Sequence, residues 1–264
     1  MPTLYKFCAP SRSDYFKEFR LRFTPPGGFN DAYECFPAID PASIDPWMDR
    51  LLDVSIRGVK NQPAAVAALT ASNMSLRSEM KSDPSVLQEM FRRHLFTIQD
   101  STFGVLCLTE KIDSQLMWAH YAVDHTGFAI GYDSSHSFFK NEPEKGVGIP
   151  SIQKVTYQLA RPLVDLCQFQ FRWQHVMVKH TDWAYENEWR MVKQLSHANV
   201  VKDIGLPLKL HLFDIPKDAV VSVIFGIRAT PALKEVIKGH IAANAPHVIV
   251  KEARYSPSDF KVLV

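Results

Sequence analysis

The run Phe103-Gly104-Val105-Leu106-Cys107-Leu108 separates two kinds of pattern in this 264-residue chain. The run is short, apolar and free of proline, which predicts a buried strand. Before it, apolar side chains recur at helical spacing through residues 45–99, so we expect a helical insertion there. After it, strand-like and helix-like segments follow one another without strict alternation. This pattern predicts an α+β fold rather than a doubly wound parallel sheet.

Short apolar segments on both sides of this run complete the predicted sheet. The further strands are expected at Leu4–Phe7, Leu21–Phe23, Phe128–Tyr132, Ile152–Tyr157, Arg190–Lys193, Leu208–Phe213, Val220–Ile227 and Val248–Glu252. Shorter helices are expected at Asp14–Leu21, after an N-cap at Asp113, near Gln168–Lys179 and at Pro231–Ala243. We find no repeat or linker, so residues 1–264 are expected to form a single domain. Its sheet should be mixed and mostly antiparallel, with the helical insertion lying over it.

The composition is that of an ordinary globular protein, with 46% hydrophobic and 22% charged residues. The net charge of +2 is close to balanced, and the basic residues are scattered along the chain. A pI near 8.3 neither supports nor excludes nucleic-acid binding. No two of the four cysteines stand at metal-ligand spacing. Neither a signal peptide nor an apolar run of about 20 residues is visible. We therefore expect a cytoplasmic protein with reduced cysteines and no membrane partner.

A polar loop follows the sequence Pro25-Pro26-Gly27-Gly28, which cannot continue a regular element. The loop contains Asn30, Asp31 and Glu34. An Asx turn that leads into a helix N-cap explains these residues. A loop that holds a ligand or a catalytic side chain also explains them, because exposed loops on a rigid scaffold often carry function.

Aromatic and histidine side chains gather on the helix predicted after Asp113. Trp118, Tyr121 and His125 fall on one helical face, and His120 lies off it. Aromatic core packing with partly buried histidines is one interpretation. The other is a pocket wall whose rings stack on a base or nucleotide beside a titratable histidine. A zinc site is not favoured, because the two histidines stand five residues apart and have no third ligand beside them.

A third cluster combines carboxylates and an arginine. If a strand begins here, alternation places Glu186, Glu188 and Arg190 on the same face. The aromatic residues around them are Trp183, Tyr185 and Trp189. A salt-bridged surface strand is one interpretation. The other is a pair of carboxylates with distinct roles, one ionised and one with a raised pKa.

In this order, the clusters resemble DUF2971, a bacterial protein family of unknown function. The matching residues are Leu4–Phe7, Leu21–Pro25, Phe29–Glu34, Gly104–Glu110, Met117–Ala122, His125, Gly127, Gly131–Asp133, Trp183, Tyr185–Glu186, Glu188–Arg190 and Ile224–Gly226. The resemblance covers nearly the whole chain. One departure is Ala32, where the family usually has proline, and this loosens the turn without removing its polar side chains. The resemblance implies a family and leaves its chemistry open.

The order of three features is also similar to that of ADP-ribosyltransferases. In that superfamily an early strand carries an arginine or histidine that holds NAD, and a middle strand carries a small hydroxyl residue. A late Glu-x-Glu or single Glu stabilises the cationic ribose. Here Lys6, Thr109 and Glu186-Asn187-Glu188 stand in the same order. Lysine lacks the forked donor geometry of arginine, so the first position departs from that pattern.

This likeness implies Glu188, Glu186 and Lys6 as catalytic residues and NAD as the substrate. Cleavage of the nicotinamide bond develops an oxocarbenium ion, which a fixed carboxylate stabilises. The residues expected to bind NAD, or another nucleotide-like small molecule, are Tyr5, Asn30, Asp31, Thr109, Trp118, His120, Tyr121 and Arg190. No metal is expected for this chemistry, and the acceptor, protein or nucleic acid, stays open.

Two other functions remain open. A metal-dependent hydrolase or nuclease would use Asp31, Glu34, Glu186 and Glu188 to hold Mg²⁺ or Mn²⁺. A non-catalytic module would bind a nucleotide or a partner protein, for example in phage defence. The sequence has no Gly-rich phosphate loop, no Gly-x-Ser-x-Gly elbow and no His-Glu-x-x-His motif. P-loop nucleotidase, serine hydrolase and zincin functions are therefore not indicated.

Overall fold

The computed structural model describes residues 2–140, 151–170 and 173–264. Its main sheet has seven strands in the order β14-β13-β5-β1-β4-β10-β6. These strands are β1 (Thr3–Cys8), β4 (Phe103–Thr109), β5 (Phe128–Asp133), β6 (Gln153–Lys154), β10 (Glu188–Gln194), β13 (Val220–Phe225) and β14 (Ile249–Glu252). Neighbouring strands are antiparallel except β13 and β14, which are parallel. The predicted α+β fold with a mixed, mostly antiparallel sheet is confirmed.

Smaller elements surround this sheet. A three-stranded sheet contains β11 (Val200–Lys202), β12 (Leu210–Asp214) and β2 (Arg20–Phe23). The two-stranded pairs are β3 (Ala38–Ile39) with β8 (Leu163–Val164), β7 (Thr156–Gln158) with β9 (Val178–His180), and β15 (Arg254–Tyr255) with β16 (Val262–Leu263). Short 3₁₀ helices are found at Pro10–Arg12, Pro26–Gly28, Pro41–Ser43, Ser137–Phe139, Trp173–Met177, Thr181–Glu186, Leu195–His197 and Lys217–Ala219.

Helices cover both faces of the sheet near β5 and β1. Helices α1 (Tyr15–Glu18) and α6 (Pro231–Asn244) share one apolar cluster with side chains such as Phe128 and Phe225. Each fully buried phenylalanine of this kind contributes roughly 1.5–3 kcal/mol to folding. On the opposite face, α5 (Gln115–Tyr121) packs Trp118 edge-on against Phe7, with 4.9 Å between ring centroids. The alternation of side chains along β1 and β5 supplies both layers.

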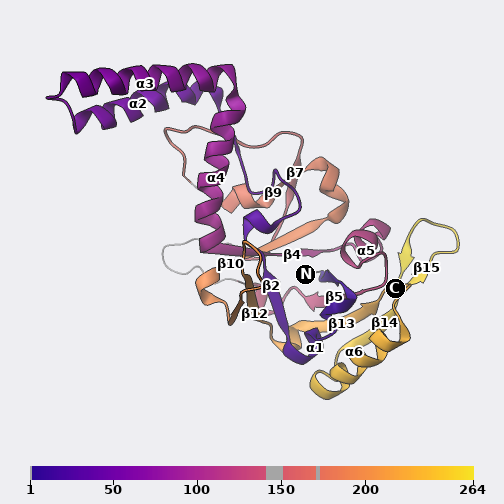
Figure 1. Cartoon of the computed structure of the whole chain (residues 1–264). Coiled ribbons are helices and arrows are strands. Elements are labelled where there is room, and N and C mark those ends of the chain that lie inside the picture. Colours follow the sequence, from indigo (N-terminus) through magenta and orange to yellow (C-terminus); the bar gives the residue numbers. More distant parts are fainter. Residues whose placement is uncertain (1, 141–150, 171–172) are drawn as a thin grey trace.

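The helical insertion consists of α2 (Ile44–Arg57), α3 (Pro63–Ser82) and α4 (Pro84–Thr102). We expected it to lie over the sheet, but α2 and α3 pair with each other and project away from the sheet, and α4 leads back to it (Figure 1). The reason is that the few buried side chains of α2 and α3, Met48 and Met80 among them, pack with Leu87 of α4 in a separate small core. Hydrophobic periodicity gives the buried face of a helix but not its partner.

Three local expectations need correction. The N-cap of α5 is Ser114, whose hydroxyl accepts from the Met117 N–H at 3.4 Å, rather than Asp113. The strand expected at Ile152–Tyr157 is divided into β6 and β7, because the chain changes its partner: β6 pairs with β10, whereas β7 pairs with β9. The segment near Gln168–Lys179 is no α-helix within the described residues. It ends in a 3₁₀ turn followed by β9, whereas residues 171–172 lie outside the described ranges.

No helix in the part of the chain that the structure describes has the length and apolar character needed to cross a membrane.

Candidate functional site

A cavity opens where two central strands diverge. Strands β1 and β4 pair at one position, Tyr5 opposite Thr109, and Glu188 of β10 lies opposite Thr109 on the other side. Residues directly opposite each other project from the same face, so these three side chains form a row across the sheet. Lys6 of β1 and Cys107 of β4, beyond the single pair, both line a cavity of about 240 Å³. We call it the central cavity.

The central cavity collects residues from distant parts of the chain. They come from β1, β2, the segment that follows β2, β4, α5, β9, the end of the 3₁₀ helix Thr181–Glu186 and the start of β10. Its lining residues are Tyr5, Lys6, Phe7, Arg22, Thr24, Gly28, Phe29, Asn30, Glu34, Val105, Cys107, Leu108, Thr109, Met117, Tyr121, Lys179, Glu186 and Glu188.

A left-handed residue turns the Glu-x-Glu segment toward the cavity. Asn187 has φ 43° and ends the 3₁₀ helix Thr181–Glu186, and asparagine tolerates this conformation better than most residues. The Thr109 hydroxyl donates to the carbonyl of Glu186, and the Glu188 N–H bonds to the Tyr157 hydroxyl oxygen at 2.8 Å. These bonds fix the backbone on both sides of Asn187, so both carboxylates reach the same cavity.

The wall of the central cavity contains a buried ionic cluster, which we define as Glu34, Lys179, Glu186, Glu188 and Arg190; the first four line the cavity, and Arg190 lies behind them. All five side chains are buried. The Lys179 ammonium lies among the three carboxylates, at 3.1 Å from Glu34, 2.6 Å from Glu186 and 3.3 Å from Glu188. Arg190 donates to Glu188 through Nε and Nη2, both at 2.9 Å, and also to Glu34. With every group ionised, three carboxylates face two cations, so the cluster carries a net charge of −1.

The two carboxylates of the Glu-x-Glu segment differ in acidity. Burial raises the pKa of Glu186, although Lys179 and Tyr121 act in the opposite direction. Burial also acts to raise the pKa of Glu188, but Arg190 and Lys179 outweigh it and lower this pKa to about 2. The Tyr121 hydroxyl donates to Glu186 at 2.5 Å. Glu188 is therefore a fixed carboxylate anion at neutral pH, whereas Glu186 is the stronger base of the pair.

Cations line another part of the central cavity. The Lys6 ammonium donates to the Cys107 carbonyl at 3.0 Å. The Nε atom of Arg22 is shielded from solvent and has no hydrogen-bond partner among the described residues. Burial, followed by repulsion from Arg12, lowers the pKa of Arg22. A buried guanidinium donor without an acceptor is costly, so an anionic group placed beside Arg22 would relieve that cost.

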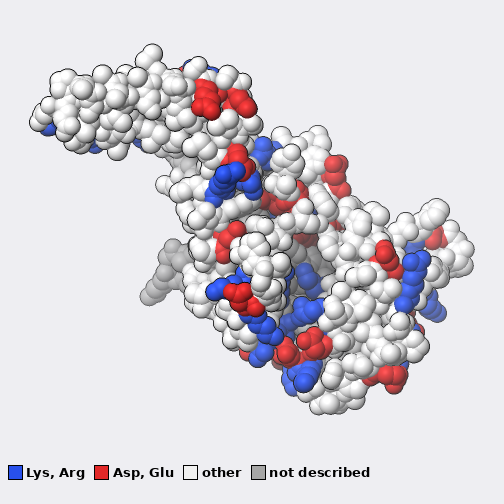
Figure 2. Space-filling view, in the orientation of Figure 1, with Lys and Arg blue, Asp and Glu red and all other residues white. Residues whose placement is uncertain are grey.

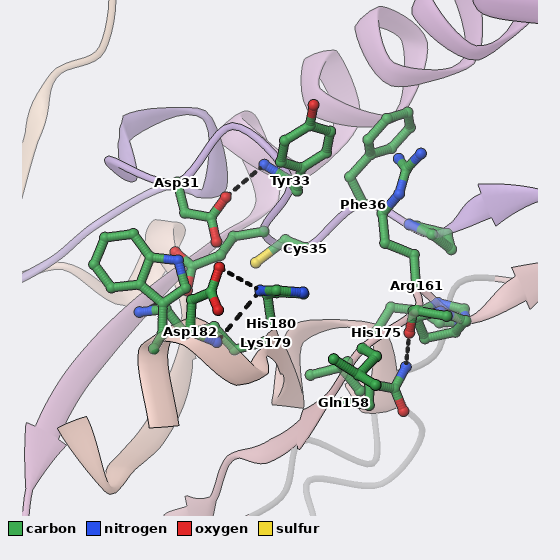
Figure 3. Close-up of a pocket in the computed structure, with 17 residues that line it drawn as sticks. Asp31, Tyr33, Cys35, Phe36, Gln158, Arg161, His175, Lys179, His180 and Asp182 are labelled. Carbon is green, nitrogen blue, oxygen red and sulfur yellow. Dashed lines mark hydrogen bonds and ion pairs between the residues drawn. The ribbon is translucent and has the colours of Figure 1, made fainter. Parts of the chain in front are cut away.

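A second, larger cavity of about 420 Å³ adjoins this site, and we call it the lateral cavity (Figure 3). Glu34 and Lys179 line both cavities. The lateral cavity is otherwise formed by the loop Asp31–Pro37, by residues 158–162, and by residues between His175 and Trp183.

Of the residues expected to form a site, the structure brings most into the central cavity. Those that line it are Tyr5, Lys6, Asn30, Thr109, Tyr121, Glu186 and Glu188. Asp31 lines the lateral cavity instead, where its carboxylate accepts from the Tyr33 N–H at 2.9 Å and completes an Asx turn. No helix follows this turn, and Cys35 has φ 57°. The turn that the sequence predicted is present without the helix N-cap.

Three other residues that were expected to contact a ligand do not line the central cavity. Trp118 is completely buried, and its indole N–H donates to the Ile112 carbonyl at 2.8 Å, so its ring belongs to the core. His120 is exposed beside Tyr185, at 3.2 Å from its hydroxyl, and does not line the central cavity. Arg190 is completely buried behind the carboxylates and positions them. The expectation of core packing was thus the better one for Trp118.

Sequence reasoning missed Lys179 and Arg22. Lys179 stood at the end of a segment expected to be helical, although it follows the apolar run Val176-Met177-Val178. Because a short apolar run fits a helix as well as a strand, it gave no signal that the lysine after it is buried. Arg22 alternates with the buried residues Leu21 and Phe23 of β2, which gave no indication that its side chain reaches a cavity.

A cation already occupies the centre of the carboxylates that were considered for a metal. In the described ranges, no group of three or more His, Cys, Asp or Glu side chains is arranged to hold a metal ion. The Lys179 ammonium stands among Glu34, Glu186 and Glu188, and Asp31 lines the other cavity. The geometry therefore matches a proteinaceous ionic cluster rather than an Mg²⁺ site.

The segment from α5 to β10 contributes Tyr121, Lys179, Glu186 and Glu188 to this site. Residues 117–191 match the DUF2971 family. Its description is "protein of unknown function", and the match covers less than a third of the chain. The resemblance to DUF2971 is confirmed over this segment. No curated protein and no solved structure matches the chain, so the likeness to ADP-ribosyltransferases rests on the residue pattern alone.

Proposed function

We propose that the central cavity binds NAD and that the chain cleaves its nicotinamide–ribose bond, as an ADP-ribosyltransferase or NAD glycohydrolase. One observation carries this proposal. Four residues line one cavity: Lys6 on β1, Thr109 on β4, Glu186 at the end of the 3₁₀ helix Thr181–Glu186, and Glu188 at the start of β10. These are the positions at which the sequence is similar to ADP-ribosyltransferases, and they come from widely separated parts of the chain.

The distribution of charge supports this ligand. NAD joins a cationic nicotinamide riboside to an anionic diphosphate. The net charge of −1 on the ionic cluster suits the cationic end, and Lys6 and Arg22 suit the diphosphate. A volume of about 240 Å³ is below the range of roughly 300–1,000 Å³ that encloses a whole drug-sized ligand. The cavity would therefore enclose the nicotinamide–ribose half, with the adenosine end outside it.

The carboxylates account for the chemistry. When the C1′–N bond breaks, its electron pair leaves with neutral nicotinamide, and an oxocarbenium ion remains on the ribose. Glu188, ionised and fixed by Arg190, stabilises this positive charge. An acceptor hydroxyl or water then forms the new bond to C1′ and gives its proton to Glu186, the stronger base of the two. Tyr5 and Tyr121 supply aromatic rings beside the nicotinamide.

Nicotinamide release from NAD, with and without a chelator, tests this proposal. The variant is Glu188→Gln. The matched control is Glu252→Gln, which makes the same change at a half-exposed glutamate paired with Lys234. We expect release by the wild-type and control proteins whether or not the chelator is present, and a loss of about 100-fold in Glu188→Gln. Thermal unfolding and NAD titration show whether the variant is folded and still binds.

Loss of release with the chelator would replace this proposal with the metal-dependent one. The absence of both NAD binding and nicotinamide release would overturn it. Equal release by Glu188→Gln and wild type would remove the role given to Glu188.

A second candidate is a non-catalytic nucleotide-binding module. The observation that favours it is the engagement of Glu188 by both Arg190 and Lys179, which offsets part of the charge that catalysis would use. In such a module the ionic cluster would only shape the cavity. Binding of NAD to the wild-type protein with no release of nicotinamide would favour this candidate.

A further inference from the structure

The lateral cavity has features of a ligand site that the proposed reaction does not use. It is larger than the central cavity, at about 420 Å³ against about 240 Å³. The ion pair between Glu34 and Lys179, 3.1 Å apart and buried, lies in the wall that the two cavities share. A ligand in the lateral cavity would therefore occupy a separate site from one in the central cavity.

Arg161 is the principal cation of this site. Its guanidinium lies over the rings of Tyr33 and Phe36, at 5.4 and 5.1 Å from their centroids. Its Nη1 atom is shielded from solvent and has no hydrogen-bond partner among the described residues. The two rings hold the guanidinium in place, and its buried Nη1 donors lack an acceptor among the described residues. An oxyanion with several acceptor oxygens, such as a phosphate, satisfies a guanidinium best.

The other side of the cavity carries acceptors. Asp31, His180 and Asp182 lie together on the side opposite Arg161 (Figure 3). The His180 Nδ1 atom lies 3.1 Å from the Asp182 carboxylate. Carboxylates are the usual partners of ribose hydroxyls, whereas they repel a phosphate. A ligand with a phosphate at one end and hydroxyls at the other fits this division of charge.

Aromatic surface completes the site. The Tyr33 side chain is 66% exposed, which is high for a ring in the wall of a cavity. Trp183 also lines the cavity, and the Lys179 ammonium lies 4.5 Å from the centroid of its ring. An exposed ring such as that of Tyr33 can stack on a planar heterocycle, and the partly buried ring of Trp183 adds apolar surface to the wall.

We infer that the lateral cavity is a second ligand site and that it binds a nucleoside monophosphate. The phosphate pairs with Arg161, the ribose hydroxyls bond to Asp31 or Asp182, and the base stacks on exposed aromatic surface such as Tyr33. The cavity volume lies within the range of about 300–1,000 Å³ typical of sites that enclose a small molecule. This inference goes beyond the proposed NAD chemistry and stands whether or not NAD is cleaved.

Calorimetric titration of the full chain with AMP and with UMP tests the inference. Arg161→Gln removes the cation, and Tyr33→Ala removes an exposed ring with little risk to folding. Arg93→Gln is the matched control, because this arginine is 77% exposed on α4 and pairs with Glu89. Lys6→Gln alters the central cavity instead. We expect Arg161→Gln and Tyr33→Ala each to weaken binding at least about 10-fold, and the other two variants to leave it unchanged.

Adenosine and ribose 5-phosphate separate the parts of the ligand. Each should bind more weakly than AMP, and only ribose 5-phosphate should lose affinity in Arg161→Gln. The inference is overturned if neither nucleotide binds, or if binding is unchanged in Arg161→Gln. If Lys6→Gln alone weakens nucleotide binding, the nucleotide binds in the central cavity, and the inference is overturned as well. Because nicotinamide release is measured separately, failure here is distinct from failure of the NAD proposal.

Discussion

Two regions of the molecule use the same charged residue types in opposite surroundings. On the helical insertion, Lys81 pairs with Asp45 at 2.8 Å and Arg93 with Glu89 at 2.7 Å, all with 40% or more of the side chain exposed. In the ionic cluster, the Lys179–Glu186 pair at 2.6 Å has side chains only 3% and 4% exposed. The distances are alike, and the surroundings differ.

The difference in burial determines how much each set of ion pairs can contribute to stability. An exposed ion pair contributes about 0–1 kcal/mol to folding, because water solvates both partners almost as well. A buried ion loses several kcal/mol of hydration, which its partners must offset. The cluster is therefore a costly way to stabilise a sheet, and its position in the wall of the central cavity fits a role in function. The blue and red side chains on the projecting helices lie on the open surface of the molecule (Figure 2).

The largest expected effect follows from removing a cation of the cluster. Arg190→Met leaves Glu188 and Glu34 buried without their arginine partner. We expect the free energy of unfolding to fall by about 3–5 kcal/mol. Urea unfolding followed by circular dichroism measures this change. A loss below about 1 kcal/mol would mean that the cluster is as well solvated as a surface pair.

Lowering the pH should reduce the free energy of unfolding by less than Arg190→Met does. The pKa of Glu188 is lowered to about 2 in the folded state, so its contribution to stability is present above pH 4.5 and is lost as pH falls toward 2. Wild type should thus lose stability more steeply than Glu188→Gln across this interval.

The contribution of Glu186 to stability should depend on pH in the opposite direction. Because folding raises its pKa, its contribution to stability is present below pH 4.5 and is lost as pH rises through the folded pKa. Above pH 4.5, wild type should therefore lose stability relative to Glu186→Gln. Parallel pH curves for wild type and both variants would contradict the assigned pKa directions.

Thr109→Val probes the backbone around the Glu-x-Glu segment. The substitution keeps the shape of the side chain but removes the hydroxyl that donates to Glu186 O and accepts from the Lys111 N–H at 2.8 Å. We expect the free energy of unfolding to fall by about 1–3 kcal/mol, because two buried or half-buried backbone groups lose their hydrogen-bond partner. The loss is measured by urea unfolding, and the control is Thr97→Val at an exposed position of α4, where the hydroxyl donates to the Arg93 carbonyl. Equal losses in the two variants would contradict a special role for Thr109.

The smallest effect is expected on the helical insertion. Lys81→Met breaks an exposed pair with Asp45 and should change the free energy of unfolding by less than about 1 kcal/mol. Urea unfolding of this variant beside Arg190→Met gives the comparison directly. If Lys81→Met lowers the free energy of unfolding as much as Arg190→Met does, the burial of an ion pair does not determine how much it contributes to stability.

The strands of the central sheet could be predicted from the sequence, whereas the packing of the elements against one another could not. The runs Phe103–Leu108 and Phe128–Tyr132 are apolar over their whole length, which is a local signal for buried strands. The projection of α2 and α3 depends on which apolar faces meet, and periodicity does not contain that information. Arg190 and Trp118 were expected at a ligand, but both are buried and neither lines the central cavity, and burial depends on the whole fold.

The Glu-x-Glu segment could be singled out because charged residues beside several tryptophans and tyrosines are unusual for a core strand. Its partner Lys179 could not, because helix and strand patterns are hard to distinguish in the short apolar run before it.

The structure of the protein bound to an uncleavable carba analogue of NAD would test the central claim most directly. The proposal predicts the nicotinamide and its ribose in the central cavity beside Glu186 and Glu188, with the diphosphate against Lys6 and Arg22. An analogue bound only in the lateral cavity, or no analogue bound at saturating concentration, would contradict it.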